Sequence, residues 1–481
     1  MKESFIQLLL QKAKDLGCEY ADFRYEETEQ QNLSVKNEQV EAISNGFDRG
    51  FGIRVLKKGY FGFSSSATAD EKEAITVLME AVRIAEASSL IKADPIQLAP
   101  VPVHRDKVSS HAIKNPLSVP IAEKMEYLQS ATASMKLHED CKIRKASMHA
   151  RIQYKQFCST EGTYIEQDRI TSGAGIHVLA FGNQDMQIRS YPNSFGGDFS
   201  TFGYEFIEQM KLLENGPIIA EEARELVYAP VCEAGEKDII LDGNQLALQV
   251  HESIGHPTEL DRVFGYEAAY AGTSFLTPDK LFHFQVGSPI VNIVADATIP
   301  GALGGFAYDD EGVPGNRVFL VKEGLFVGYL NSRETCWRIG EKPMGSMRAD
   351  SFSRIPIIRM TSINLEPGDK TVQELISGIE DGLWLSGIKS WSIDDRRLNF
   401  QFATEIAREI KQGKLGKIVK NPTYIGETPT FWKSCDGIAN REFWHVWGVP
   451  NCGKGQPTQI MTVSHGTAPA RFRNIKVGVA K

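Results

Sequence analysis

The residues with the clearest chemical potential form one short stretch in the middle of the chain, from His251 to His256. The two histidines lie five positions apart, and Glu252 directly follows the first of them. Neutral imidazoles are ligands for Zn²⁺, and a carboxylate beside a water molecule on the ion can act as a general base. The stretch therefore predicts a hydrolytic metal site, although the familiar zinc-peptidase pattern has one residue fewer between its histidines.

The additional residue sets a geometric condition on the backbone. On a regular helix, residues five apart are separated by roughly 140° around the axis, so His251 and His256 could not reach one ion. A π-bulge absorbs one residue and tends to occur at functional sites. Gly255 supplies backbone freedom, and Pro257 disfavours helical torsion angles at His256. The sequence therefore predicts a distorted helix that joins the two imidazoles; the alternative is a chance match, with histidines that are solvated or satisfied on a regular helix.

The elements around this stretch are expected to hold it rigidly. Residues 237–241 have the pattern of a short strand, residues 242–244 that of a turn with a helix N-cap, and residues 245–256 that of a helix. A strand–turn–helix unit of this kind fixes the direction of the side chains on the helix.

A catalytic zinc ion usually takes three protein ligands, so a third must come from another part of the chain. Candidates are His283, His445, His465, Cys435, Cys452 and carboxylates such as Glu259. Cys452 lies in a turn-rich loop, where Lys454 and backbone N–H groups would favour a thiolate. A free cysteine without a metal explains this position equally well. His445 has aromatic neighbours and is expected to be packed among them.

No organic cofactor is predicted. The loop of residues 448–457 nearly matches a phosphate-binding P-loop, but Gly455 stands where a magnesium-binding hydroxyl is required, and Pro457 opposes the helix that should follow. A nucleotide-dependent enzyme is therefore a weak alternative.

Composition and charge exclude several classes of protein. Of the 481 residues, 42% are hydrophobic and 24% are charged, and the net charge is −8 at pH 7. A net negative charge does not favour binding to nucleic acid or to an anionic membrane. No segment approaches the ~18 apolar residues that a membrane helix needs. The N-terminal residues are expected to form an amphipathic helix and not a signal peptide. Seven scattered cysteines without a C-x-x-C pair fit reduced thiols in a cytoplasmic protein.

The hydrophobic patterns predict an α+β fold. N-terminal α/β regions with antiparallel strands should precede a larger β-rich C-terminal domain, and we place the domains at residues 1–96, 97–229 and 230–481. In the first, a helix is followed by several short strands, the last two joined in a hairpin at residues 57–59, and then by a helix capped by Asp70. The second, expected to pack with the first, has strands at 143–157, 164–170 and 175–181 between helices.

Two segments resemble the TldD/PmbA family. The run from His251 to Asp261 is similar to the metal motif of that family, and residues 451–457 (Asn-Cys-Gly-Lys-Gly-Gln-Pro) are similar to its C-terminal motif. Residues 50–55, 59–63 and 309–312, together with the total length, extend the resemblance over most of the chain. The resemblance implies a zinc-dependent peptidase with His251, His256 and Cys452 as ligands and Glu252 as catalytic base. It also implies a cytoplasmic, barrel-like dimer.

The chain carries the metal motif, so it resembles the metal-bearing subunit of pairs in which a second homologue lacks the motif. Residues 387–397 depart from the Gly/Asn/Thr-rich segment of the TldD type, which leaves both a homodimer and a heterodimer with a metal-less homologue open. Our hypothesis is hydrolysis of unfolded or extended peptides that lie along a sheet edge, with water activated by zinc and Glu252. The alternative is a non-catalytic peptide-binding or regulatory subunit.

Overall fold

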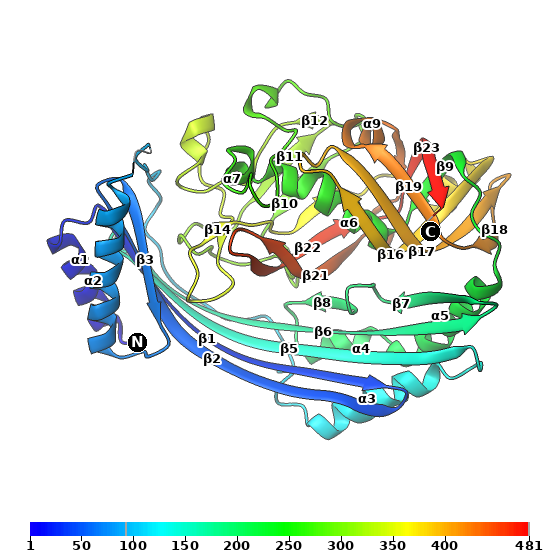
Figure 1. Ribbon diagram of the computed structural model, residues 1–481, viewed down its shortest axis with the longest axis horizontal. Coiled ribbons are helices and arrows are strands. Elements are labelled where there is room, and N and C mark those ends of the chain that lie inside the picture. Colours follow the sequence, from blue (N-terminus) through cyan, green and yellow to red (C-terminus); the bar gives the residue numbers. More distant parts are fainter. Residues whose placement is uncertain (92–93, 480–481) are drawn as a thin grey trace.

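A long curved sheet forms one side of the molecule in the computed structural model, which describes residues 1–91 and 94–479 (Figure 1). Its main path is β3 (Tyr60–Ser66), β2 (Gln39–Lys57), β1 (Tyr20–Lys36), β5 (Cys141–Ser159), β6 (Tyr164–Gly182) and β4 (Arg105–Val108). Two further strands pair with β6, namely β7 (Asp185–Tyr191) and β8 (Asp198–Ser200). β1 and β5 pair along almost their whole length, so strands from residues 1–96 and from residues 97–229 form one sheet.

Several strands of this sheet are longer than the sequence patterns predicted. β1 has 17 residues and β6 has 19, where shorter strands were expected in each place. Backbone pairing with β5 keeps the polar middle residues of both strands in the extended conformation. The predicted hairpin at residues 57–59 is confirmed by the pairing of β2 with β3.

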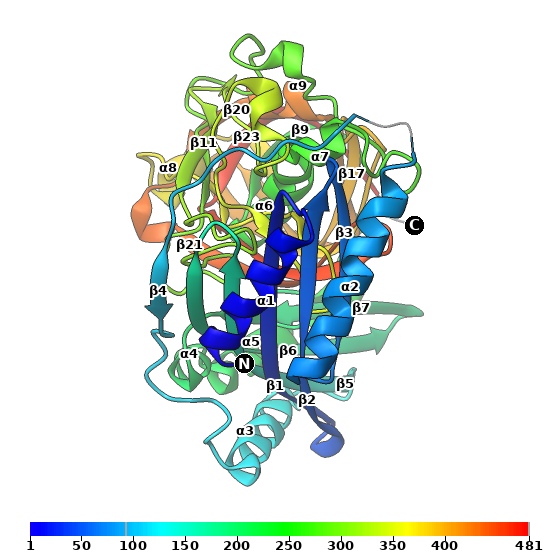
Figure 2. The same cartoon turned by 90° about the vertical axis from the view of Figure 1, so that its left-hand side faces the viewer.

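Helices cover the two ends of the curved sheet. At one end, α1 (Glu3–Asp15) and α2 (Glu71–Ser88) lie side by side across β1, β2 and β3 (Figure 2). Asp70 caps α2 as predicted, because its carboxylate accepts a hydrogen bond of 2.8 Å from the backbone of Glu73. The other end is covered by α3 (Ile121–Ser134), α4 (Tyr204–Gln209) and α5 (Leu212–Tyr228).

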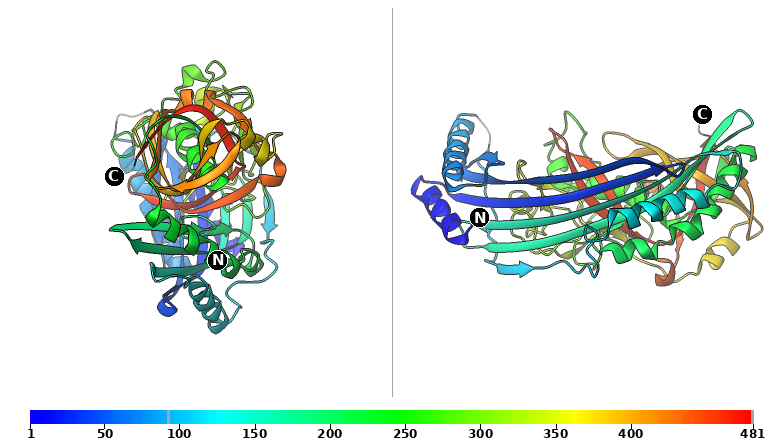
Figure 3. Two further views of the ribbon diagram at one scale, coloured as in Figure 1. Left: turned by 90° about the vertical axis from the view of Figure 1, so that its right-hand side faces the viewer. Right: turned by 90° about the horizontal axis from the view of Figure 1, so that it is seen from below.

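The C-terminal part of the chain lies over the concave side of the curved sheet, and a ring of strands forms its centre (Figures 1 and 3). β16 pairs with both β9 and β17, which closes a ring of five strands: β16 (Asp381–Ile393), β9 (Gly235–Leu241), β23 (Ala470–Val479), β19 (Pro422–Glu427) and β17 (Asn399–Lys411). β18 (Lys414–Val419) and β20 (Cys435–Ile438) extend it. The helix α6 (Gly243–Val250) packs into this ring, where Gln245 donates a 2.9 Å hydrogen bond to Tyr424 of β19.

Smaller sheets complete the C-terminal part. They are the four-stranded sheet of β12 (Leu325–Phe326), β11 (Arg317–Lys322), β10 (Ile293–Asp296) and β15 (Ile363–Leu365), the pair of β13 (Met347–Arg348) and β14 (Ile357–Ile358), and the hairpin of β21 (His445–Lys454) and β22 (Gln459–Thr467). The prediction of an α+β fold with antiparallel strands and a β-rich C-terminal part is confirmed. Among the described helices, none has the length and apolar character needed to cross a membrane.

A buried ion-pair network joins the curved sheet to the C-terminal part. Arg54 of β2 lies 2.7 Å from Asp22 of β1 and 3.1 Å from Glu311, and all three side chains are at most 1% exposed. Burial opposes the charge on Arg54, but the two carboxylates outweigh burial and raise its pKa above the ordinary value. The network therefore fixes the curved sheet against the C-terminal part.

Candidate metal centre

The helix that carries the two histidines changes its hydrogen-bonding pattern at the site. α6 begins after Asp242, whose carboxylate accepts a 2.7 Å hydrogen bond from the backbone of Gly243. A π-helical turn follows from His251 to Gly255, and then a 3₁₀ turn from His256 to Thr258. The π turn absorbs the additional residue, as the sequence predicted, and the two imidazole centroids lie 4.8 Å apart.

Two neighbours explain why this distorted segment is stable. The Thr258 hydroxyl lies 2.9 Å from the backbone carbonyl oxygens of both Ile254 and Gly255 and shares its one proton with these acceptors, where the helix type changes. A Cβ atom on Gly255 would lie 2.2 Å from the sulfur of Met360, so only glycine fits here without a shift of that side chain. A glycine at position 255 therefore has a second reason besides backbone freedom, namely its close approach to Met360.

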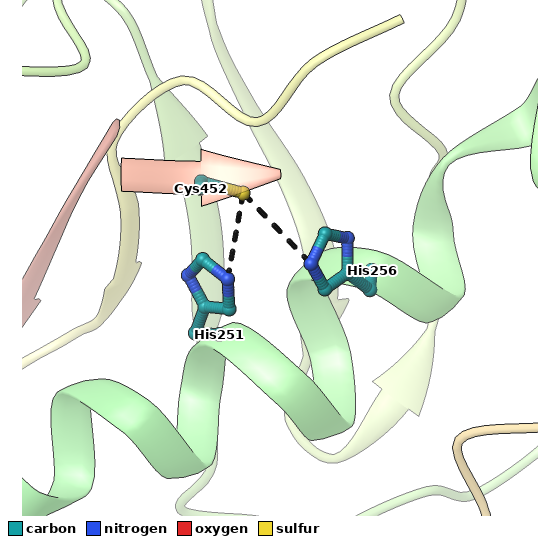
Figure 4. A group of neighbouring side chains, drawn as sticks. All are labelled: His251, His256 and Cys452. Carbon is teal, nitrogen blue, oxygen red and sulfur yellow. Dashed lines mark hydrogen bonds between the residues drawn. The ribbon is translucent and has the colours of Figure 1, made fainter. Parts of the chain in front are cut away.

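Cys452 meets the two histidines from the β21–β22 hairpin (Figure 4). Its sulfur lies 3.5 Å from Nε2 of His251 and 3.8 Å from Nε2 of His256, and the three ligand atoms all lie within 4.8 Å of one another. The hairpin has an irregularity in register between Val449 and Cys452, and such bulges redirect a side chain. The three side chains are buried, with exposures of 7%, 4% and 4%.

These donors fit a zinc ion in type and in the spacing between sulfur and each nitrogen. For tetrahedral zinc with the usual bond lengths, a sulfur and a nitrogen ligand should lie about 3.6 Å apart, close to both observed separations. Burial would raise the pKa of the Cys452 thiol, but its neighbours, first His251 and then the Arg359 guanidinium, outweigh burial and hold the pKa well below its ordinary value. A thiolate is the form that binds metal, so the surroundings of Cys452 favour a ligand.

The outer nitrogens of both histidines have partners that fix their tautomers. Nδ1 of His465 lies 3.1 Å from the carbonyl oxygen of Ile363, which can only accept, so this nitrogen carries the proton. Burial lowers the pKa of His465 well below its ordinary value, so the ring is neutral and its Nε2 accepts from Nδ1 of His251 at 2.7 Å. The lone pair on Nε2 of His251 is thereby left for the centre of the site.

His256 is oriented in the same manner by a carboxylate. Its Nδ1 lies 2.8 Å from Oε2 of Glu259, which directs the lone pair on Nε2 toward Cys452. Glu259 is fully buried and is held in turn by Arg262, with Lys454 3.7 Å away. Burial lowers the pKa of His256 well below its ordinary value, consistent with a neutral ligand.

Glu252 lies on the same π turn and is 6% exposed. Nη1 of Arg397 donates to its Oε2 at 2.7 Å. Arg397 belongs to the turn between β16 and β17, within the segment that departs from the resembled family pattern. The site therefore contains a carboxylate with a cation bound to one of its oxygens.

The other candidates for a third ligand do not belong to the cluster of His251, His256 and Cys452. His465 and Glu259 contact the outer nitrogens of His251 and His256 and do not join Cys452 in the ligand cluster. Burial raises the pKa of Cys435 to about 12, and this thiol lies in the hydrophobic core. His283 is exposed. His445 contacts Trp447, but its side chain is 49% exposed and bonded to Asp198, so the prediction of close packing was only partly right.

A cavity of about 1070 Å³ lies between the curved sheet and the C-terminal part. Its lining includes Arg151, Asp168 and Arg169 from the sheet, and Pro450 and Met461 from the hairpin that carries Cys452. The three clustered ligand residues do not line it. The cavity therefore reaches the hairpin next to the candidate metal centre and offers both charges to a bound molecule.

Three family models match consecutive parts of the chain. They describe PmbA/TldA metallopeptidase domain 1 at residues 21–89, the central domain at residues 114–229 and the C-terminal domain at residues 234–479. A metalloprotease of Methanocaldococcus jannaschii is 30% identical over 458 residues, covering 94% of this chain and 96% of the relative. A zinc metalloprotease TldD homolog of Saccharolobus solfataricus is 24% identical over 478 residues, covering 98% of each chain.

Solved structures have the same fold. A Thermotoga maritima protein gives a TM-score of 0.79 at 17% identity and covers 99% of this chain and 100% of its own. TldE from Thermococcus kodakarensis gives 0.74 at 14% identity and covers 98% and 100%. These matches extend over nearly the whole chain and agree with the family models, so the chain belongs to the PmbA/TldD metallopeptidase family.

Proposed function

We propose that this chain is a zinc-dependent peptidase that hydrolyses unfolded or extended peptides in the cytoplasm. His251, His256 and Cys452 are the metal ligands in this proposal, and Glu252 is the general base. The observation that carries it is the convergence of three ligand atoms within 4.8 Å in a buried site. Partners that direct a lone pair of each histidine inward support it further.

Zinc bound by these residues would acidify a water molecule and polarise the scissile carbonyl. Glu252 takes a proton from the water as the water oxygen bonds to the carbonyl carbon. The same carboxyl group then gives this proton to the amide nitrogen as the C–N bond breaks, so that one acid and one amine leave. A carboxylate has about four acceptor positions, and Arg397 occupies one of them, which leaves Glu252 able to accept the proton.

The cavity beside the hairpin favours a peptide as the substrate. Its volume exceeds the roughly 300–1,000 Å³ of common small-molecule sites, so it can hold several residues of an extended chain. Side chains of both charges line it and can pair with the charged termini or side chains of a peptide. The relatives named metalloproteases support the reaction class.

The proposal includes a dimer. The partner is a second copy of this chain or a homologue without the metal motif, and the likeness to TldE is consistent with either because it concerns the fold. Native mass spectrometry of the purified protein distinguishes a homodimer from a chain that needs a second subunit.

The decisive experiment compares Glu252→Gln with wild type on extended peptides while zinc is measured in both. We expect hydrolysis to fall about 10²- to 10⁴-fold with zinc still bound, because the variant loses only the base. Glu233→Gln, an exposed change of the same type, is the control and should match wild type. Undiminished hydrolysis by Glu252→Gln would eliminate the base assignment. A wild-type protein with stoichiometric zinc and no hydrolysis would indicate the non-catalytic subunit instead.

A further inference from the structure

Arg397 is held in an unusual backbone conformation that directs it at the candidate metal centre. Its φ of 62° lies in the left-handed region, where side chains other than glycine are strained. Its backbone N–H bonds the carbonyl of Asp394 at 2.8 Å, and its carbonyl accepts from the hydroxyl of Thr428 at 3.0 Å. A strained residue held on both sides indicates that the position of its side chain matters.

The guanidinium group of Arg397 has hydrogen-bonding capacity that the protein does not use. Nη1 donates to Glu252, but Nε is buried and has no partner among residues 1–91 and 94–479. The side chain is only 16% exposed, so bulk water does not solvate it freely. Its partner Glu252 directly follows the ligand residue His251 on the same π turn, which places the guanidinium group beside the ligand cluster.

A charged hydrogen-bond donor without a partner, placed beside a general base, can stabilise a substrate atom that becomes negative during the reaction. When water adds to a peptide carbonyl, the carbonyl oxygen gains negative charge, and a preorganised donor lowers the barrier. Arg359, the other arginine at the cluster, also has a buried Nε without a partner among the described residues. Its side chain is fully buried, however, and its Nη1 and Nη2 donate to the backbone carbonyls of Gln459 and Cys452, whereas the Arg397 side chain is 16% exposed. Arg397 borders the carboxylate that would activate the water.

We propose that Arg397 is a catalytic residue whose Nε–H donates to the oxygen of the scissile carbonyl, while its Nη1–H holds Glu252. This role rests on the proposed peptidase function. Arg397 forms no covalent bond and transfers no proton, because a guanidinium group remains charged throughout. The donor is absent from the metal motif itself and comes from a turn 145 residues farther along the chain.

The test removes the side chain without disturbing the turn. Glycine adopts a positive φ without strain, so Arg397→Gly should keep the turn and the metal site. Arg396→Gly, an exposed neighbour in the same turn with the same change of charge, is the matched control. We expect kcat to fall about 10²- to 10³-fold in Arg397→Gly, the loss seen when one oxyanion donor is removed. KM should change little, zinc content should be unchanged, and Arg396→Gly should behave as wild type.

A binding measurement separates this role from simple positioning of Glu252. A phosphinic peptide carries a tetrahedral anion, so Arg397→Gly should weaken its affinity by a factor similar to the loss in kcat, while a product peptide is little affected. The same weakening should occur in a Glu252→Gln background. If it occurs only when Glu252 is present, Arg397 acts through Glu252 and the proposal is wrong. Unchanged kcat in Arg397→Gly also refutes it and leaves the peptidase function standing, whereas an inactive wild type refutes both.

Discussion

Replacement of His465 is the sharpest test of how the site holds its metal. His465 is fully buried, and its Nε2 accepts the proton on Nδ1 of His251 at 2.7 Å. In His465→Phe this acceptor is lost, and the buried N–H of His251 is left without a partner. The imidazole of His251 can recover only by moving its proton to Nε2, which removes the lone pair that faces Cys452.

The expected cost can be stated from the contacts. Loss of a hydrogen-bonding partner behind a metal-bound histidine typically weakens metal affinity 10- to 100-fold, which is about 1.4–2.8 kcal/mol. An unsatisfied buried donor costs about 1–3 kcal/mol, the same range by an independent route. His465→Phe should therefore bind zinc 10- to 100-fold more weakly than wild type, with the curved sheet unaffected.

The assay is a zinc competition titration against a chelator of known affinity at pH 7. His465→Gln is the informative companion, because its side-chain oxygen can still accept from His251 and should restore part of the affinity. His138→Phe serves as the control, since that histidine bonds Glu221 of α5 and does not belong to the ligand cluster. Zinc affinity in His465→Phe equal to that of wild type would refute the tautomer argument.

Two further predictions follow from the same contacts. Cys452→Ala should lose stoichiometric zinc in metal analysis while Cys435→Ala keeps it, because only the former thiol lies in the ligand cluster; zinc retained in Cys452→Ala would move the ligand role to another residue. Arg54→Met should lower the free energy of unfolding by about 3–5 kcal/mol, because two buried carboxylates lose their counter-charge. Urea unfolding measures this, with the exposed Arg49→Met as control, and equal stability of the two variants would contradict it.

Local features of the fold were accessible from the sequence. The cap at Asp70, the hairpin at residues 57–59 and the strand–turn–helix unit before His251 depend on torsion angles and hydrogen bonds between near neighbours. The π turn belongs to the same class, because one additional residue between two histidines requires it if they are to meet. The lengths of β1 and β6 were not accessible, since pairing with β5 decides them and local composition does not.

At the candidate site, the sequence by itself determined a pair of histidines, a neighbouring glutamate and the distortion that joins them. Residue spacing could not choose a third ligand among distant histidines, cysteines and carboxylates, and only the family resemblance implied Cys452. This residue lies 201 residues from His251 and meets it through the register of the β21–β22 hairpin. The places of His465 behind one ligand and Arg397 beside Glu252 were likewise set by strand pairing across the C-terminal part. Spacing along the chain governs contacts within one turn of helix, whereas contacts between distant segments depend on how whole sheets close and pack.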